Sequence, residues 1–235
     1  MNASVVVSTS SSLVASRFSP RRIAGFAGLA FAIVVGFVNL FVGSLGAPLS
    51  DASGQEVIDF VSGNSGALTL AIGVVPIGVI SLFAFLAAVF PVLSRTSPEA
   101  AFWTRVGAAG IILVEVMFLV RILFESALVA NIDSLAAEPA LVETIWTIQG
   151  AGLIFAGLAL SLTLTGLSRA ARIVGLIPAW QQALGFGAAA GFVIQAIASV
   201  TALDGSPIAL LGLVSFVCWL TWLAITSVRL LRSSE

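Results

Sequence analysis

Six apolar stretches of about 20 residues or more dominate this sequence and limit what it can fold into. A lipid bilayer offers no hydrogen-bond partner to a free backbone amide or carbonyl, so an apolar stretch of this length crosses it as an α-helix. We therefore predict an all-α, polytopic integral membrane protein, a bundle of six transmembrane helices. The expected spans are residues 23–44, 67–93, 106–130, 141–167, 180–202 and 208–228.

Composition supports this class and argues against several kinds of chemistry. The chain is 59% hydrophobic and 9% charged, whereas a soluble domain is about one quarter charged. It has no His and no Lys, so the usual general base, the common haem ligand and a Schiff-base lysine are missing. Its one cysteine, Cys218, allows no internal disulfide and no Cys-based metal cluster. We expect no enzymatic activity, no cofactor, no metal and no nucleic-acid partner.

Positive and negative charges alternate between the loops that join these stretches. An excess of positive charge marks the cytoplasmic side of a membrane, so we expect both termini in the cytoplasm. Arginine without lysine is typical of a GC-rich bacterial genome, which suggests a bacterial plasma membrane. The Ser-rich residues 1–20 are expected to form a disordered cytoplasmic tail before a transmembrane domain over 21–235. The cytoplasmic arginines would be Arg17, Arg21, Arg22, Arg95, Arg105, Arg169, Arg172, Arg229 and Arg232, and the external acids Asp51, Glu56, Asp59, Asp133, Glu138 and Asp204.

The stretch VEVMFLVRILFESA, residues 114–127, places three charged residues inside the third span. Each charge at the centre of a span costs about 2.5 to 3.5 kcal/mol on the insertion scale. Arg121 and Glu125 are four residues apart and can form an ion pair on one helix face. Two interpretations stay open: a functional site that faces the bundle interior, or a structural pair that sets helix register.

Depth along the helices groups further polar residues with this pair. At 1.5 Å per residue, Asn39, Arg121, Glu125, Gln149 and Gln195 fall roughly 5–11 Å outside the membrane midplane. Stripes of small residues, which mark helix contacts, place Asn39 and Gln195 on inward faces. These stripes are Gly25, Gly28, Ala32, Gly36, Asn39 and Gly43 in the first span, and Gly187, Gly191, Gln195 and Ser199 in the fifth.

Glu115 completes the set of candidate binding residues but occupies another position on the third span. It falls near the bilayer centre and about 120° around the helix from Arg121, so we expect no direct ion pair between them. An unpaired carboxylate at that depth is costly. We therefore predict a neutral Glu115 that is hydrogen-bonded to a neighbouring helix.

Three segments carry a resemblance to a known family. They are RRIAGFAGLAFAIVVG, DASGQEVIDFVSGNSG and RIVGLIPAWQQALGFGAA. Over most of its length after residue 20, the chain resembles an uncharacterised bacterial family of six-span membrane proteins, numbered 4386 among the domains of unknown function. Members typically carry a basic residue before the Trp of the Pro-Ala-Trp motif, where this chain has Ala179. The resemblance implies a six-span fold and no particular activity.

Two functions are consistent with these observations. The first is a small transporter-like or ligand-binding bundle with a polar site that opens outward. The second is a structural or accessory subunit whose Gly-rich helix faces bind other membrane proteins or a second copy of the chain, the polar cluster serving only to lock the helices. A membrane enzyme ranks third, because no nucleophile–base pair and no metal site is evident.

Overall fold

The computed structural model describes residues 19–233, and these residues form seven helices and no strand. The all-α prediction is confirmed. The tail expected over residues 1–20 lies almost entirely outside the described residues. The helices are α2 (Pro20–Ser44), α3 (Gly54–Ser94), α4 (Pro98–Leu135), α5 (Pro139–Ile173), α6 (Ala179–Ile197), α7 (Ser199–Leu203) and α8 (Ile208–Arg232).

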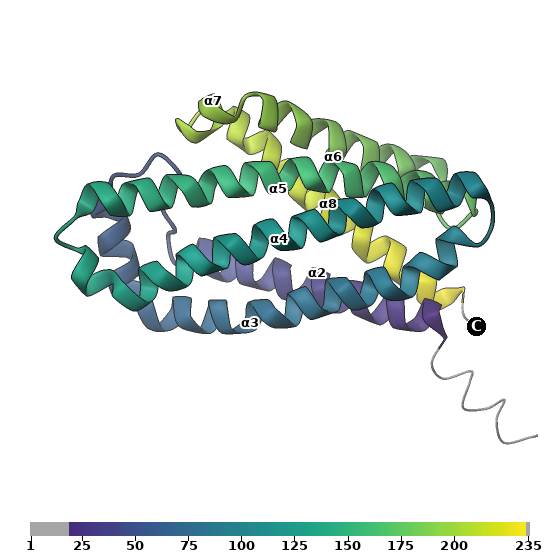
Figure 1. Ribbon diagram of the computed structural model, residues 1–235, viewed down its shortest axis with the longest axis horizontal. Coiled ribbons are helices and arrows are strands. Elements are labelled where there is room, and N and C mark those ends of the chain that lie inside the picture. The colour runs from purple at the N-terminus through teal and green to yellow at the C-terminus, as the bar shows by residue number, and fades with distance from the viewer. Residues whose placement is uncertain (1–18, 234–235) are drawn as a thin grey trace, which may run out of the picture.

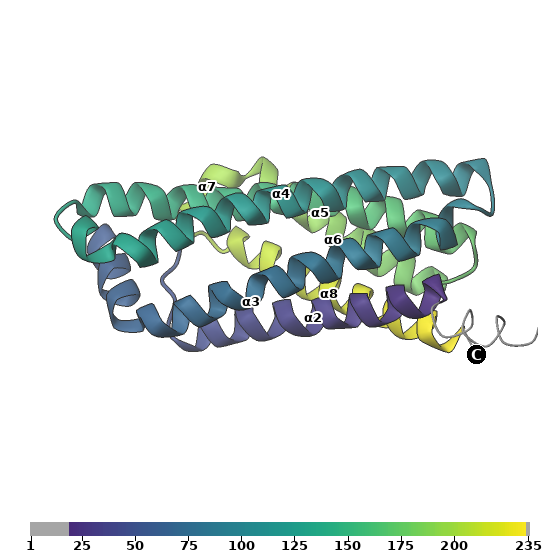
Figure 2. The same ribbon diagram turned by 60° about the horizontal axis from the view of Figure 1, so that its bottom comes forward.

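The long helices lie alongside one another in an elongated bundle (Figures 1 and 2). The start of α2 and the end of α8 lie at the same end of this bundle (Figure 1), where Arg21 Nη1 donates a hydrogen bond of 3.1 Å to the carbonyl of Ser233. We call this the arginine end, and the opposite end, near which Asp51, Asp133 and Asp204 lie, the acidic end. The arginine end holds Arg21, Arg22, Arg95, Arg105, Arg169, Arg172, Arg229 and Arg232.

Local sequence signals explain where the helices begin. Ser19, Ser53 and Ser97 are N-caps whose hydroxyl groups accept a hydrogen bond from a backbone N–H in the first turn. Ser53 forms a complete capping box with Glu56, whose carboxylate accepts from the Ser53 backbone N–H. Proline occupies the start of α2, α4 and α5, where its missing N–H is not needed.

Five of the described helices, α2, α3, α4, α5 and α8, are long and apolar enough to cross a bilayer. The expected span over residues 180–202 differs from the structure. Its helix, α6, ends at Ile197, the backbone leaves helical geometry at Ala198, and α7 follows as a separate short helix. Three glutamines, Gln181, Gln182 and Gln195, lower the hydropathy of α6. The helix α6 is therefore not among the five helices that are long and apolar enough to be identified as spans.

The helices α3, α4 and α5 are longer than a bilayer requires. They have 41, 38 and 35 residues, whereas about 20 suffice to cross the hydrocarbon core. The segment 54–66, which lies outside the expected spans, forms the first turns of α3, with one departure from helical geometry at Asn64 (φ −124°, ψ 16°). The added length builds a second hydrophobic cluster at the acidic end, which includes Val57, Ile58, Phe60, Val61, Leu68, Leu128, Ile132 and Val142.

The main hydrophobic core fills the half of the bundle nearer the arginine end. Trp219 and Trp222 of α8 are almost completely buried, and Phe31 of α2 packs edge-to-face on Trp219 with ring centroids 5.4 Å apart. The helices α4 and α5 approach each other closely through Gly107, Gly110 and Gly166. A Cβ at Gly166 would lie 2.6 Å from the carbonyl oxygen of Trp103, so only glycine allows this approach.

The predicted small-residue stripes make contacts over only part of their length. In α2, Gly25 and Gly28 pack against α8 and α3, but Gly36 and Gly43 have no atom within 4 Å of a Cβ built on them. In α6, Gly191 contacts Ser215, whereas the space beside Gly187 is open. The stripes therefore mark contact faces over only part of their length, and Asn39, expected on an inward face, is exposed.

Candidate functional site

A cavity of about 490 Å³ lies in the half of the bundle nearer the acidic end. Its walls come from α2, α3, α4 and α5, with contributions from α6, α7 and α8. Five of the six candidate residues line it, which are Asn39, Arg121, Glu125, Gln149 and Gln195. We call this the polar cavity. The structure thus brings together residues from four helices that depth alone had grouped.

Arg121 and Glu125 form the ion pair predicted from their spacing. Arg121 Nη2 lies 3.3 Å from Glu125 Oε2, and the two side chains are 26% and 12% exposed. Both partners belong to α4, so the pair joins no two helices. The buried Nε of Arg121 has no hydrogen-bond partner among the described residues, which leaves one donor of the guanidinium unused.

The three amide side chains of the polar cavity differ in how they are held. Gln149 of α5 is 4% exposed, and its Nε2 has no hydrogen-bond partner in the described chain. Gln195 of α6 lies against Gly212 of α8, where any Cβ would collide with the amide. Asn39 of α2 donates a hydrogen bond of 2.8 Å to the carbonyl of Val35 in its own helix. None of these amides therefore binds another helix through a hydrogen bond of its own that the structure shows.

Glu115 lies in a smaller pocket of about 50 Å³, whose lining it shares with Asn39 and Arg121. Asn39 and Arg121 also line the polar cavity, so the two spaces adjoin. Glu115 is 1% exposed, and neither carboxyl oxygen has a hydrogen-bond partner in the described part of the chain. The expected hydrogen bond to a neighbouring helix is therefore absent. No ion pair joins Glu115 to Arg121, as the helical wheel predicts.

The loop between α2 and α3 borders the polar cavity at the acidic end. Its residues 47–50 contribute to the lining. Trp146 of α5 donates a hydrogen bond of 2.9 Å from Nε1 to the carbonyl of Leu49, and Ser50 Oγ donates one of 3.5 Å to the carbonyl of Leu203. The loop is thus attached to α5 and to α7 beside the polar cavity.

A second polar cluster lies deep in the core and was not predicted from the sequence. Gln181 of α6 is 0% exposed, and its Nε2 donates to Thr226 Oγ1 at 2.9 Å and to the carbonyl of Trp222 at 3.3 Å. Thr226 Oγ1 in turn donates to the same carbonyl at 2.7 Å. Gln181 lies at the edge of the expected span over 180–202, and nothing in the sequence pairs it with Thr226 of α8.

The donors and acceptors of the polar cavity suit noncovalent binding. Arg121, Gln149 and Gln195 offer N–H groups, and Glu125 offers a carboxylate. Among residues 19–233, no three His, Cys, Asp or Glu side chains lie close enough to hold a metal ion.

The five long apolar helices and their bundle arrangement define the chain as a helical membrane protein. No protein-family model, no curated protein and no solved structure matches it.

Proposed function

We propose that this protein binds a small polar or amphiphilic molecule in the polar cavity, as a non-enzymatic transporter-like or ligand-binding bundle. The observation that carries the proposal is the gathering of Asn39, Arg121, Glu125, Gln149 and Gln195 around one cavity of about 490 Å³. Pockets of about 300–1,000 Å³ hold drug-sized ligands.

The hydrogen bonding in the polar cavity favours ligand binding over a purely structural role. Polar residues that hold membrane helices together do so through hydrogen bonds from one helix to another. The buried cluster of Gln181, Thr226 and Trp222 has such bonds. The pair of Arg121 and Glu125 lies within one helix, and Arg121 Nε and Gln149 Nε2 have no partner in the described chain. Buried donors are normally satisfied, and these two can donate to a bound molecule, although Trp222 Nε1 of the core cluster also has no partner in the described chain.

The lining also indicates the chemistry of the ligand. Donors outnumber acceptors, and the charged donor is a guanidinium, which suits a carboxylate or phosphate group on the ligand. Most other wall residues are apolar, among them Val38, Val42, Leu68, Ile72 and Leu153. In a transport cycle, Arg121 would hold the anionic group, while Glu125 or Glu115 changes protonation as access switches.

We also propose an orientation for the bundle. The arginine end lies in the cytoplasm of a bacterial plasma membrane, because arginine marks that side, and the polar cavity then faces the exterior. The helix α6, continued by α7, supplies the sixth crossing, an arrangement in keeping with the resemblance to the six-span family.

The direct test compares molecules that co-purify with the protein. Wild-type protein and the double variant Arg121→Gln/Glu125→Gln are purified in the same detergent, and released small molecules are compared by untargeted mass spectrometry. We expect an anionic or zwitterionic species that is enriched in wild type and absent from the variant. A folded double variant that retains every species found with wild type would contradict ligand binding at this site.

Access to the cavity can be tested separately, because the chain has a single cysteine, Cys218. In a Cys218→Ser background, Gln195→Cys should react with a membrane-impermeant thiol reagent added from outside the cell. The matched control, Ala159→Cys in the buried core of α5, should not react. Equal protection of both positions would argue against an outward opening and in favour of a closed structural bundle.

A further inference from the structure

A larger pocket, of about 790 Å³, lies at the arginine end of the bundle, away from the polar cavity. It is formed by the start of α2, the ends of α3 and α8, and the segment between α5 and α6. We call it the basic pocket, since Arg21, Arg229 and Arg232 line it and no acidic residue of the described chain does.

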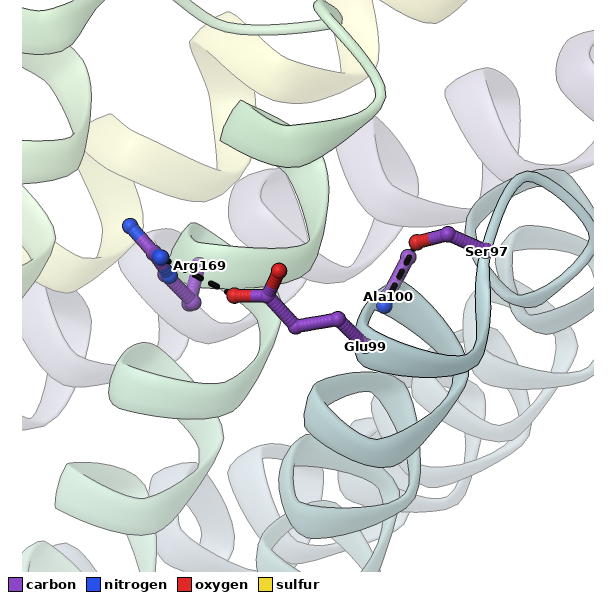
Figure 3. Close-up of polar contacts among 4 residues, drawn as sticks. All are labelled: Ser97, Glu99, Ala100 and Arg169. Carbon is purple, nitrogen blue, oxygen red and sulfur yellow. Dashed lines mark hydrogen bonds and ion pairs between the residues drawn. The ribbon is translucent and has the colours of Figure 1, made fainter.

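The charge of the basic pocket is not neutralised by the described residues around it. Of the carboxylates in residues 19–233, only Glu99 lies at the arginine end. Its Oε1 lies 2.9 Å from Arg169 Nη2, where it forms an ion pair outside the pocket (Figure 3). Three guanidinium groups around one pocket repel one another, and a bound anion would remove this repulsion.

The hydrogen bonding of the pocket arginines leaves a donor for such an anion. The Nε of Arg229 is buried and has no hydrogen-bond partner in the described chain. Arg21 uses Nη1 to hold the Ser233 carbonyl, which brings the start of α2 to the end of α8. Arginine binds a phosphate group with two parallel N–H donors, one of which is commonly Nε.

The apolar part of the lining indicates that the ligand is a lipid and not a free phosphate. Val92, Val174, Leu176, Ile225 and Val228 form an apolar wall next to the arginines. A free phosphate gains nothing from such a wall, whereas the acyl chains of a phospholipid do. The position also fits, because α2 has 25 residues, about 37 Å of helix, so that Arg21 in its first turn lies near the headgroups.

We propose that the basic pocket binds an anionic phospholipid, with its phosphate held by Arg229 and Arg232 beside Arg21. Basic pockets between transmembrane helices are suited to such headgroups. This site is independent of the polar cavity, and either can be present without the other.

The experiment uses the full-length protein in nanodiscs or detergent and phosphatidylglycerol as the probe. Native mass spectrometry compares retention of phosphatidylglycerol with that of phosphatidylcholine. We expect wild type to retain phosphatidylglycerol preferentially, and Arg229→Gln to weaken this binding about tenfold, as expected for one lost charge-assisted contact. Arg229→Lys should recover only part of the binding, since it keeps the charge but not the paired donors.

Matched controls remove an arginine from the same end without touching the pocket. Arg105→Gln and Arg172→Gln should bind phosphatidylglycerol as wild type does, because neither residue lines the pocket. Circular dichroism and size-exclusion profiles check that every variant is folded. An equal loss in pocket variants and controls would mean general surface attraction and would overturn the proposal. Displacement of the lipid by millimolar glycerol 3-phosphate would overturn it too, in favour of a soluble phosphate ligand.

Discussion

Arg121 and Glu125 form the charged centre of the polar cavity, and their coupling can be measured. Arg121→Gln leaves Glu125, 12% exposed, without its cation, and should lower stability by about 1–3 kcal/mol. The double variant Arg121→Gln/Glu125→Gln should recover most of this loss, because no unpaired charge remains. Thermal unfolding in detergent gives both values. Additive losses in the double variant would mean that the two residues are not energetically coupled.

Glu115 is a buried carboxyl group without a hydrogen-bond partner in the described chain, so we expect an unusual response to its substitution. It is 1% exposed and its carboxyl oxygens have no partner among residues 19–233. Glu115→Gln should change stability by less than about 1 kcal/mol, and Glu115→Met should raise the thermal midpoint, since a buried polar group without a hydrogen bond is costly. A large loss of folded protein in Glu115→Gln would show that Glu115 is ionised and paired.

Gln149 and Gln181 are buried glutamines that offer a matched comparison. Gln181 is bonded to α8 through Thr226 and Trp222, so Gln181→Leu should destabilise the bundle by about 1–3 kcal/mol. The Nε2 of Gln149 has no partner in the described chain, so Gln149→Leu should leave stability unchanged or higher while it reduces ligand retention. Thermal midpoints and co-purification measure the two effects. Similar thermal midpoints for both variants would contradict the view that Gln181 holds two helices together whereas Gln149 serves ligand binding.

At the scale of elements, the contact between α4 and α5 depends on glycine. Gly166→Ala would place a Cβ 2.6 Å from the backbone carbonyl of Trp103, and backbone cannot move aside as a flexible side chain can. We expect a loss of about 1–3 kcal/mol or failure to fold. The control is Gly152→Ala on the same helix, where a Cβ meets nothing within 4 Å, and alanine should be neutral or stabilising. Expression and thermal midpoint distinguish them, and equal behaviour would contradict the close approach.

The same elements show which helix ends follow from local sequence. Gly46, Gly175 and Gly205 have φ between +72° and +79° just after α2, α5 and α7, a conformation that glycine adopts without strain. The end of α6 at Ile197 has no such signal, since residues 196–199 are Ala, Ile, Ala and Ser. The apolar stretch of the sequence continues past Ile197, so the end of α6 is seen only in the folded chain.

For the whole molecule, the arrangement of charged ends predicts the topology. Ser53 and Ala136 lie at the acidic end, and Thr96 lies at the arginine end. Reporter fusions at Ser53 and Ala136 should therefore be external, and a fusion at Thr96 internal. Alkaline phosphatase and green fluorescent protein activities measure the two locations. An internal Ser53 fusion would reverse the orientation and place the polar cavity on the cytoplasmic side.

The sequence by itself determined the properties that depend on length and spacing. Apolar stretches long enough to span a bilayer predicted the helical membrane protein, and the separation of charges predicted which helix ends lie together. The pair of Arg121 and Glu125 followed from a four-residue spacing within one helix. Depth along each helix placed Asn39, Gln149 and Gln195 in the layer that now borders one cavity, because the rise per residue is the same in every helix.

The tertiary structure alone decided the properties that depend on how helices rotate and approach one another. A stripe of small residues looks the same whether it meets a helix, as at Gly28, or open space, as at Gly43. Hydrogen bonds between distant residues, such as Gln181 and Thr226, likewise depend on packing between α6 and α8. Which side chains meet across two helices depends on how the helices pack. The spacing of residues within one helix gives no information about this.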